Sequence, residues 1–167
     1  FTPVDPMEFG PRFVNTIKDN SGVQMAYGRM DVSRDRFLER AMMITYRPTT
    51  DQSNLPAASG PGVLSNQIRK VFRAQVNNDA AKHRRWWIET SLGPWVSGGD
   101  ATRNSLMNEP VIALDDKDPT RTDILHEYFV APDKFAAFVN ACRDVILSSY
   151  QDLLNITLRY VMPDDES

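Results

Sequence analysis

The sequence Asp123-Ile-Leu-His-Glu-Tyr-Phe-Val130 and the later sequence Leu153-Leu-Asn-Ile-Thr-Leu-Arg-Tyr-Val161 decide the fold. Both are rich in β-branched and aromatic residues, so each predicts a strand. Between them, Pro132 precedes an apolar stripe at helical spacing, which predicts a helix. The stripe consists of Phe135, Phe138, Val139, Cys142, Val145 and Ile146. A strand, a helix and a strand of these lengths predict a crossover unit whose helix covers one face of a sheet.

The first half of the chain supplies the rest of the predicted sheet. Residues 5–20 carry apolar side chains at helical spacing and end in a polar turn, which predicts a helix. Two strands are predicted over residues 22–30 and 36–47, joined by the polar turn at residues 31–35. Together with the crossover unit, these elements predict an α+β fold.

The middle of the chain is harder to assign. Residues 49–62 are rich in turn-forming types and predict a loop. Residues 64–89 contain no Pro or Gly and predict one long or broken helix, with the polar Asn77-Asn-Asp79 as the point of interruption. Residues 91–120 mix Gly and Pro with short apolar pieces, and irregular segments of that length are often functional.

Composition excludes several classes of protein. The 167 residues fit one domain, and 19 basic against 22 acidic residues give no global reason to bind nucleic acid or an anionic membrane. One cysteine and two histidines argue against a disulfide framework and against a Cys-rich or His-rich metal site. No apolar run approaches the ~20 residues that span a bilayer. Because the chain opens at Phe1 without Met and closes on a solvated stretch, we expect a domain cut from a longer protein.

Polar residues gather on one face of the two decisive stretches. Strand alternation places Glu127 on one face of the first stretch, and it places Asn155 and Arg159 on one face of the second, together with Thr157. If the two strands are neighbours, Glu127 and Arg159 pair on that face. The residues alone favour an internal salt bridge there over a ligand site.

Two further groups have a functional and a structural interpretation. His126 carries an imidazole group and could act as an acid, a base or a covalent anchor for a cofactor, but a single histidine in a strand is usually structural, and the same holds for Tyr128. Basic residues followed by Trp86-Trp87 resemble a surface that binds single-stranded nucleic acid. Their spacing favours a solvated basic face with the tryptophans turned inward. The basic residues are Arg69, Lys70, Arg73, Lys82, His83, Arg84 and Arg85.

A family resemblance rests on these same stretches. Residues 121–132, the helix pattern and residues 153–161 resemble the substrate-binding or cap region of bacterial FAD-linked oxidases of the vanillyl-alcohol oxidase type. Residues 103–110 and Tyr27-Gly-Arg29 fit the same pattern, so the similarity covers most of the chain.

The resemblance implies a ferredoxin-like antiparallel sheet with helices packed on one face, forming a single cap domain over residues 1–167. A separate domain of the same chain would bind FAD, and it would also carry the histidine that holds covalent FAD in some relatives. The polar sheet face would cover the flavin and shape a pocket for a small-molecule substrate. The parent enzyme would oxidise an alcohol, a sugar lactone or a related hydroxy compound by hydride transfer to flavin.

The resemblance also ranks the polar residues. Glu127 and Arg159 are the expected catalytic residues, and the expected substrate-binding residues are Tyr128, His126, Asn155 and Arg29. A stand-alone ferredoxin-like module that binds a small anion or a partner protein is the main alternative. Nucleic-acid binding through residues 69–87 ranks below it.

Overall fold

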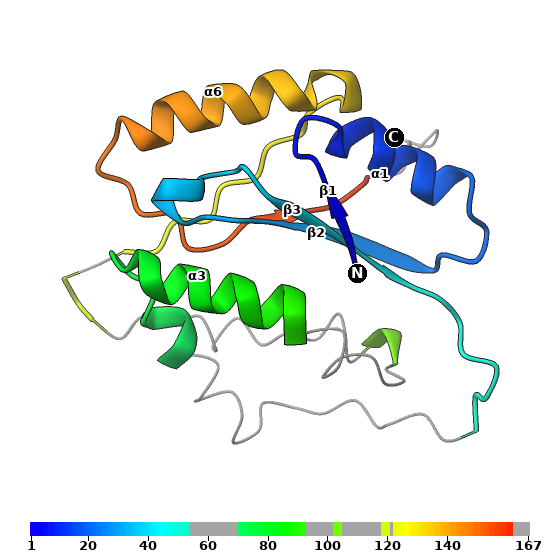
Figure 1. The fold of residues 1–167 in the computed structure, drawn as a ribbon. Helices are drawn as coiled ribbons and strands as arrows, with labels where there is room; N and C mark the ends of the chain where they lie inside the picture. The colour runs from blue at the N-terminus through cyan, green and yellow to red at the C-terminus, as the bar shows by residue number, and fades with distance from the viewer. Residues whose placement is uncertain (54–69, 93–101, 105–117, 121, 162–167) are drawn as a thin grey trace. The chain divides into compact units, whose positions relative to one another are not determined.

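A computed structural model describes residues 1–53, 70–92, 102–104, 118–120 and 122–161 (Figure 1). The chain divides into two compact units. Unit 1 comprises Phe1–Pro48 and Val130–Ser167, and unit 2 comprises Thr49–Phe129. Unit 2 is therefore inserted in the sequence of unit 1. That residues 1–167 serve as one cap domain stays a prediction.

Unit 1 is built on a four-stranded antiparallel sheet. Its strands are β1 (Thr2–Val4), β2 (Met25–Met30), β3 (Ala41–Tyr46) and β4 (Thr157–Leu158), in the order β1-β3-β2-β4. Because all neighbours are antiparallel, β1 and β2 run parallel with β3 between them, and β3 and β4 run parallel with β2 between them.

Two helices complete this unit. Helix α1 (Phe9–Lys18) connects β1 to β2, and α6 (Phe135–Leu147) leads into β4. The resulting β-α-β-β-α-β order is that of a ferredoxin-like fold, which confirms the predicted α+β class. Both helices lie on the same side of the sheet (Figure 1), and their side chains form a core with that face. The buried core residues are Val4, Phe9, Phe13, Met30, Val32, Phe37, Leu38, Ala41, Met43 and Val139.

Gly28 allows α1 to approach the centre of the sheet. A Cβ atom at this position would lie 2.3 Å from Cζ of Phe9 and 3.0 Å from Cβ of Leu158. The Phe9 ring, which is 1% exposed, therefore occupies the space that a side chain on β2 would fill. The absence of a side chain at residue 28 is what lets the helix pack closely on this strand.

The N-terminal elements are confirmed with shorter bounds. The predicted helix over residues 5–20 begins at Phe9, and the two predicted strands shorten to β2 and β3. Their connection is longer than the predicted turn because it has its own structure, including a short 3₁₀ helix (Arg34–Arg36). Backbone bonds from Asp31 N to Arg40 O (3.0 Å) and from Leu38 N to Asp31 O (2.9 Å) close it.

The decisive C-terminal region is confirmed in part. Helix α6 forms where the sequence predicts a helix, and Pro132 lies in a short 3₁₀ helix (Pro132–Lys134) just before it. Val145 is 64% exposed and lies outside the buried stripe. Of residues 153–161, only Thr157–Leu158 forms a strand. The predicted alternation nevertheless holds, because the partly buried side chains that pack on the core include Ile156, Leu158 and Tyr160.

The predicted strand over residues 123–130 is wrong. The structure has no strand there, and residues 123–129 are all exposed. A strand needs a neighbour for its backbone N–H and C=O groups, and no backbone hydrogen bond joins Ile124, Leu125 or Phe129 to any described residue. Consequently the predicted crossover unit does not form. In unit 1 the strand that precedes α6 is β3, and β3 runs parallel to β4 with β2 between them.

From residue 70 onward, unit 2 contains the broken helix that the sequence predicts over residues 64–89, and residues 64–69 lie outside the described part of the chain. A helical turn at residues 70–73 is followed by a turn, by α3 (Asp79–Trp87) and by a π-helical end (Ile88–Leu92). The break falls at Asn77, whose φ is 52°, and at Asn78, whose side chain accepts a hydrogen bond from Ala81 N (3.1 Å). Asn78 therefore caps α3.

Other predictions for the middle of the chain meet different outcomes. Trp87 is 56% exposed and Lys82 is 2% exposed, so the tryptophans do not all turn inward and the basic residues do not all face solvent. Arg69, most of the predicted loop over 49–62 and most of residues 91–120 lie outside the described residues. In the part of the chain that the structure describes, no helix is long and apolar enough to cross a membrane.

Candidate functional site

The site of interest lies on the face of the sheet opposite α1 and α6, which we call the distal face. Gly28 and Met30 of β2 point into the core, so alternation turns Tyr27 and Arg29 to the distal face. Tyr46 of β3 shares this face, and its ring stacks on that of Tyr27 with centroids 6.3 Å apart. The distal face therefore carries aromatic rings beside a cation.

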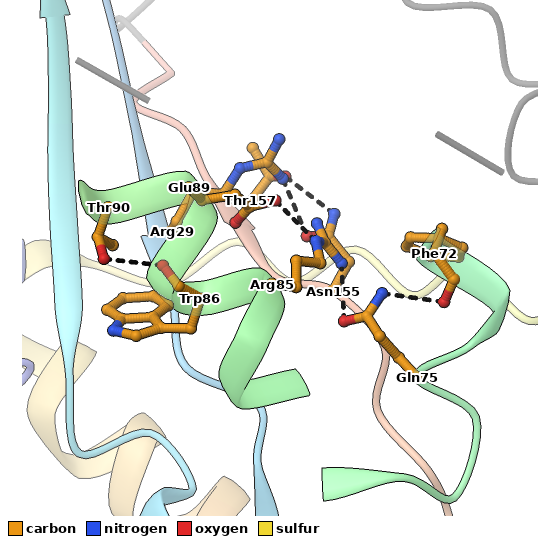
Figure 2. A network of polar contacts seen from close by, with 9 residues as sticks. All are labelled: Arg29, Phe72, Gln75, Arg85, Trp86, Glu89, Thr90, Asn155 and Thr157. Carbon is orange, nitrogen blue, oxygen red and sulfur yellow. Dashed lines mark hydrogen bonds and ion pairs between the residues drawn. The ribbon is translucent and has the colours of Figure 1, made fainter. Parts of the chain in front are cut away.

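Arg29 is fixed by three neighbours. Its Nη1 donates to Oδ1 of Asn155 (3.0 Å) and to Oγ1 of Thr157 (2.7 Å), as Figure 2 shows. The pairing of β2 with β4 places Thr157 directly opposite Arg29, which explains why residues 128 positions apart meet. The guanidinium carbon also lies 5.4 Å from the Tyr27 ring centroid, within cation–π range. We call Tyr27, Arg29, Asn155 and Thr157 the Arg29 cluster.

One edge of the Arg29 guanidinium group has no partner among the described residues. The two hydrogen bonds use both protons of Nη1, whereas Nε and Nη2 make none. Nε–H and the adjacent N–H of Nη2 point the same way and form the fork that binds a carboxylate through two parallel bonds. Arg29 also forms no ion pair in the described part of the chain.

A second arginine of the same hairpin shows this edge in use. Asp31 is 1% exposed, and its Oδ2 accepts hydrogen bonds from Nε of Arg40 (2.8 Å) and from Nη2 of the same side chain. Oδ1 of Asp31 accepts from the N (3.0 Å) and the Oγ (2.8 Å) of Ser33. The carboxylate is thus fully engaged inside the β2–β3 connection, where it has a structural role.

The same connection holds the C-terminal end of α6. Nη2 of Arg34 donates to the backbone oxygen of Leu147 (2.7 Å), and its Nη1 donates to that of Gln151 (3.3 Å). Nη2 of Arg143 on α6 pairs with Oε1 of Glu39 (3.2 Å). These contacts fix the point from which the chain continues into β4, and so they position Asn155 and Thr157.

The predicted residues 126–128 lie in unit 2, on the segment that lacks a strand. The rings of His126 and Tyr128 are stacked, with centroids 6.1 Å apart, so these two side chains share a side as alternation predicts. Glu127 is exposed, as is Arg159 just after β4 in unit 1. Because Glu127 and Arg159 belong to different units, their pairing stays a prediction.

Two arginines of unit 2, Arg85 and Arg73, have partners within that unit, and Figure 2 shows those of Arg85. Arg85 pairs through Nε with Oε1 of Glu89 (2.7 Å), and its Nη1 donates to Oε1 of the buried Gln75 (3.3 Å). The guanidinium carbons of Arg85 and Arg73 lie 5.2 Å and 5.5 Å from the Phe72 ring centroid. Arg73 also forms a forked ion pair with Asp123. These contacts favour a structural role for Arg73 and Arg85 over nucleic-acid binding.

The structure therefore joins the six predicted site residues in two pairs, Arg29 with Asn155 in unit 1 and His126 with Tyr128 in unit 2. The Arg29 cluster also contains Thr157, which the sequence placed on the same face as Asn155, and Tyr27, which fits the family pattern but was not a predicted site residue. The signal for Tyr27 was its position two residues before Arg29 in a strand, which puts both on one face. Among the described residues, no group of three or more His, Cys, Asp or Glu side chains could hold a metal ion.

Comparisons with protein families, with curated proteins and with solved structures find no match for this chain.

Proposed function

We propose that this chain is the substrate-binding cap of an FAD-dependent oxidoreductase that oxidises an alcohol, a sugar lactone or a related hydroxy compound. The resemblance of residues 121–132 and 153–161 to such caps supports the proposal. The observation that carries it is the Arg29 cluster, which gathers hydrogen-bond donors on the distal face of a ferredoxin-like sheet. In the family that this chain resembles, the polar sheet face covers the flavin.

The residues of the distal face fit a role in orienting a polar ligand. Arg29 offers Nε and Nη2 as donors, Asn155 and Tyr27 hold its guanidinium group in place, and Thr157 adds a hydroxyl group. FAD, held by another domain of the parent protein, would supply the acceptor for a hydride. The cap would contribute the orientation and charge that bring a substrate hydroxyl into position.

Glu127 and Arg159 keep their proposed catalytic roles, and His126 and Tyr128 their proposed substrate contacts. All four are accessible to a ligand or another domain, since His126, Glu127, Tyr128 and Arg159 are exposed. A carboxylate is suited to accept the proton of a substrate hydroxyl, and an arginine is suited to bind the oxygen that bears developing charge.

The first test is the visible absorption spectrum of the purified full-length parent protein, beside the 167-residue chain mixed with FAD. We expect a flavin spectrum in the parent and no bound flavin in the chain alone. A colourless parent that FAD does not reconstitute would contradict the proposal. It would favour a stand-alone module whose Arg29 cluster binds a small anion.

The second test is the rate of flavin reduction by substrate, measured by stopped-flow absorbance in the parent protein. We expect Arg29→Gln, Glu127→Gln and Arg159→Ala each to slow reduction by about tenfold or more, because each removes a charged hydrogen-bonding group. The flavin content should stay unchanged. Arg12→Gln is the matched control, since Arg12 is exposed on α1 and belongs to none of these groups. Rates equal to that of the control would contradict the site assignment.

A further inference from the structure

Residues 124–129 form an exposed segment whose backbone is open to another molecule. Leu125 is 88% exposed and Phe129 is 83% exposed, and no backbone hydrogen bond joins either residue to any described residue. The stacked rings of His126 and Tyr128 show the alternation of an extended chain, in which every second side chain lies on the same side. The segment therefore has the form of a strand that no described strand accompanies.

An endoprotease needs a substrate segment of this kind. An extended peptide binds to the edge of another protein through its backbone N–H and C=O groups, so these groups must be accessible. The residue before the cleaved bond then enters a pocket, which in chymotrypsin is a hydrophobic slot. Leu125, Tyr128 and Phe129 are large apolar or aromatic residues that suit such a pocket, and all three side chains are exposed. Exposed connections are also the preferred sites of proteolytic nicking.

The structure holds the segment at both of its ends. On one side, Asp123 forms a forked ion pair with Arg73, with Nη1 of Arg73 2.9 Å from Oδ1 of Asp123. On the other side, the backbone oxygen of Pro132 lies against Gly10 of α1, where a Cβ atom would be 2.5 Å from it. One cut between these two points would leave each piece of the segment held at one end alone.

The two pieces of a cut chain would stay together through unit 1. Strand β4 pairs with β2, Nη2 of Arg34 donates to the backbone oxygen of Leu147 (2.7 Å), and Arg143 pairs with Glu39 (3.2 Å). Each of these contacts joins the chain before the segment to the chain after it. Cleavage therefore releases the segment without dissolving the sheet and its two helices.

We propose that residues 124–129 are a processing site for an endoprotease with a large apolar pocket, and that cleavage inactivates the proposed catalytic site that includes Glu127. Water adds across the peptide bond after Leu125, Tyr128 or Phe129, which leaves a carboxylate on one piece and an amino group on the other. A side chain on a segment held at one end loses its fixed orientation toward a substrate. The cleavage needs no flavin, whereas the loss of activity rests on the proposed function.

The first experiment is limited proteolysis of the folded 167-residue chain with chymotrypsin, followed by mass spectrometry. Tyr150 is the internal control, because its side chain is fully exposed but Ser149 N and Gln151 O beside it each form a hydrogen bond. We expect the bonds of residues 124–129 to be cut faster than the bond after Tyr150 by about tenfold or more, since a hydrogen-bonded backbone must open before it is cut.

A variant with three exposed residues replaced tests which side chains the protease recognises. The chain with Leu125→Asp, Tyr128→Asp and Phe129→Asp should fold and should be cut in the segment more slowly by about tenfold or more, because it offers no apolar residue to the pocket. Arg12→Gln is the control and should be cut at the normal rate. Size-exclusion chromatography of the cut wild-type chain should show one species of the original mass, which separates into two pieces only in urea.

The second experiment follows the parent protein during digestion. The rate of flavin reduction by substrate should fall in proportion to the fraction of chains cut within residues 124–129, down to about one tenth or less, while the flavin stays bound. Parent protein mixed with chymotrypsin that has been inactivated beforehand is the control.

Three results would overturn the proposal: cleavage after Tyr150 as fast as cleavage in the segment, separation of the two pieces without urea, or full activity of a completely cut parent. A colourless parent whose segment is still cut would refute the flavin function and leave the processing site standing. A segment that resists chymotrypsin in a parent that reduces flavin normally would refute the processing site and leave the function standing.

Discussion

Arg29 and Arg40 belong to the same β-hairpin, yet their guanidinium groups are used in opposite ways. Arg40 presents its Nε–Nη2 edge to Asp31, a buried carboxylate that Ser33 also contacts. Arg29 is held from its Nη1 side by Asn155 and Thr157, and the same edge is left without a described partner. The first arrangement is complete in itself, and the second is arranged to receive another group.

The difference lies in where the acceptors come from. The partner of Arg40 is nine residues away in the same connection, so that the pair fixes the path of one short segment. The partners of Arg29 are Thr157 of β4 and Asn155 just before it, 128 and 126 residues away, and they offer neutral oxygens instead of a carboxylate. A positive charge that a fold positions without neutralising is typical of a binding site for an anion.

The largest expected effect is the loss of stability when the buried pair of Asp31 and Arg40 is broken. Asp31→Ala removes the acceptor of four hydrogen bonds at a residue that is 1% exposed, and should lower the free energy of unfolding by about 2–4 kcal/mol. Urea unfolding followed by circular dichroism measures this loss. Asp133→Ala is the control, because the Asp133 side chain is 69% exposed and its variant should change stability by less than ~0.5 kcal/mol. If the Asp31→Ala chain were as stable as the Asp133→Ala chain, the structural role of the Asp31–Arg40 pair would be contradicted.

The next effect concerns the core face of the strand that carries Arg29. Gly28→Ala places a methyl group against the Phe9 ring and should lower the free energy of unfolding by about 1–3 kcal/mol. Gly22→Ala is the matched control, since its nearest neighbours, the side chains of Arg47 and Asn20, lie 3.3 Å from the new Cβ atom. A Gly28→Ala chain as stable as the Gly22→Ala chain would show that α1 does not pack on β2 as described.

A smaller loss of stability is expected when Arg29 is replaced. Arg29→Gln gives up two hydrogen bonds and one cation–π contact at a half-buried position, and should cost about 0.5–1.5 kcal/mol. The same urea experiment measures it beside Asp31→Ala. A loss as large as that of Asp31→Ala would mean that Arg29 mainly stabilises the fold, and would remove the contrast between the two arginines.

The smallest effect concerns Cys142, the single cysteine of the chain, which packs against the core from α6. Burial raises the pKa of its thiol, because desolvation disfavours the thiolate. Iodoacetamide should therefore alkylate it more slowly in the native chain than in the urea-unfolded chain at the same pH.

The sign of the matching stability effect follows from the raised pKa of this thiol. The contribution of Cys142 to the free energy of unfolding is fully present below the unfolded-state pKa of the thiol and is lost as the pH rises through its higher folded-state pKa. Equal alkylation rates in the native and unfolded chains would contradict the burial of this thiol.

Periodicity predicted the elements of this fold better than it predicted their partners. The apolar residues from Phe135 to Ile146 predicted α6 correctly, because their helical spacing puts them on one side of the helix, and that side packs on the core. Residues 123–130 have an equally strong strand pattern and yet form no strand, because composition does not specify which neighbour supplies the hydrogen bonds. Likewise, the pattern placed Asn155 on a polar face, but only the pairing of β4 with β2 shows that Arg29 faces it.

The measurement that tests the central claim most directly is hydrogen exchange of the arginine Nε–H groups with water, followed by NMR on the free 167-residue chain. Arg29→Lys and Arg40→Lys assign the two signals. We predict slow exchange for Arg40, whose Nε–H is bonded to the buried Asp31, and exchange close to that of the exposed Arg12 for Arg29. An Arg29 Nε–H as strongly protected as that of Arg40 would show that its edge is already occupied, and would contradict the account of an anion-binding site.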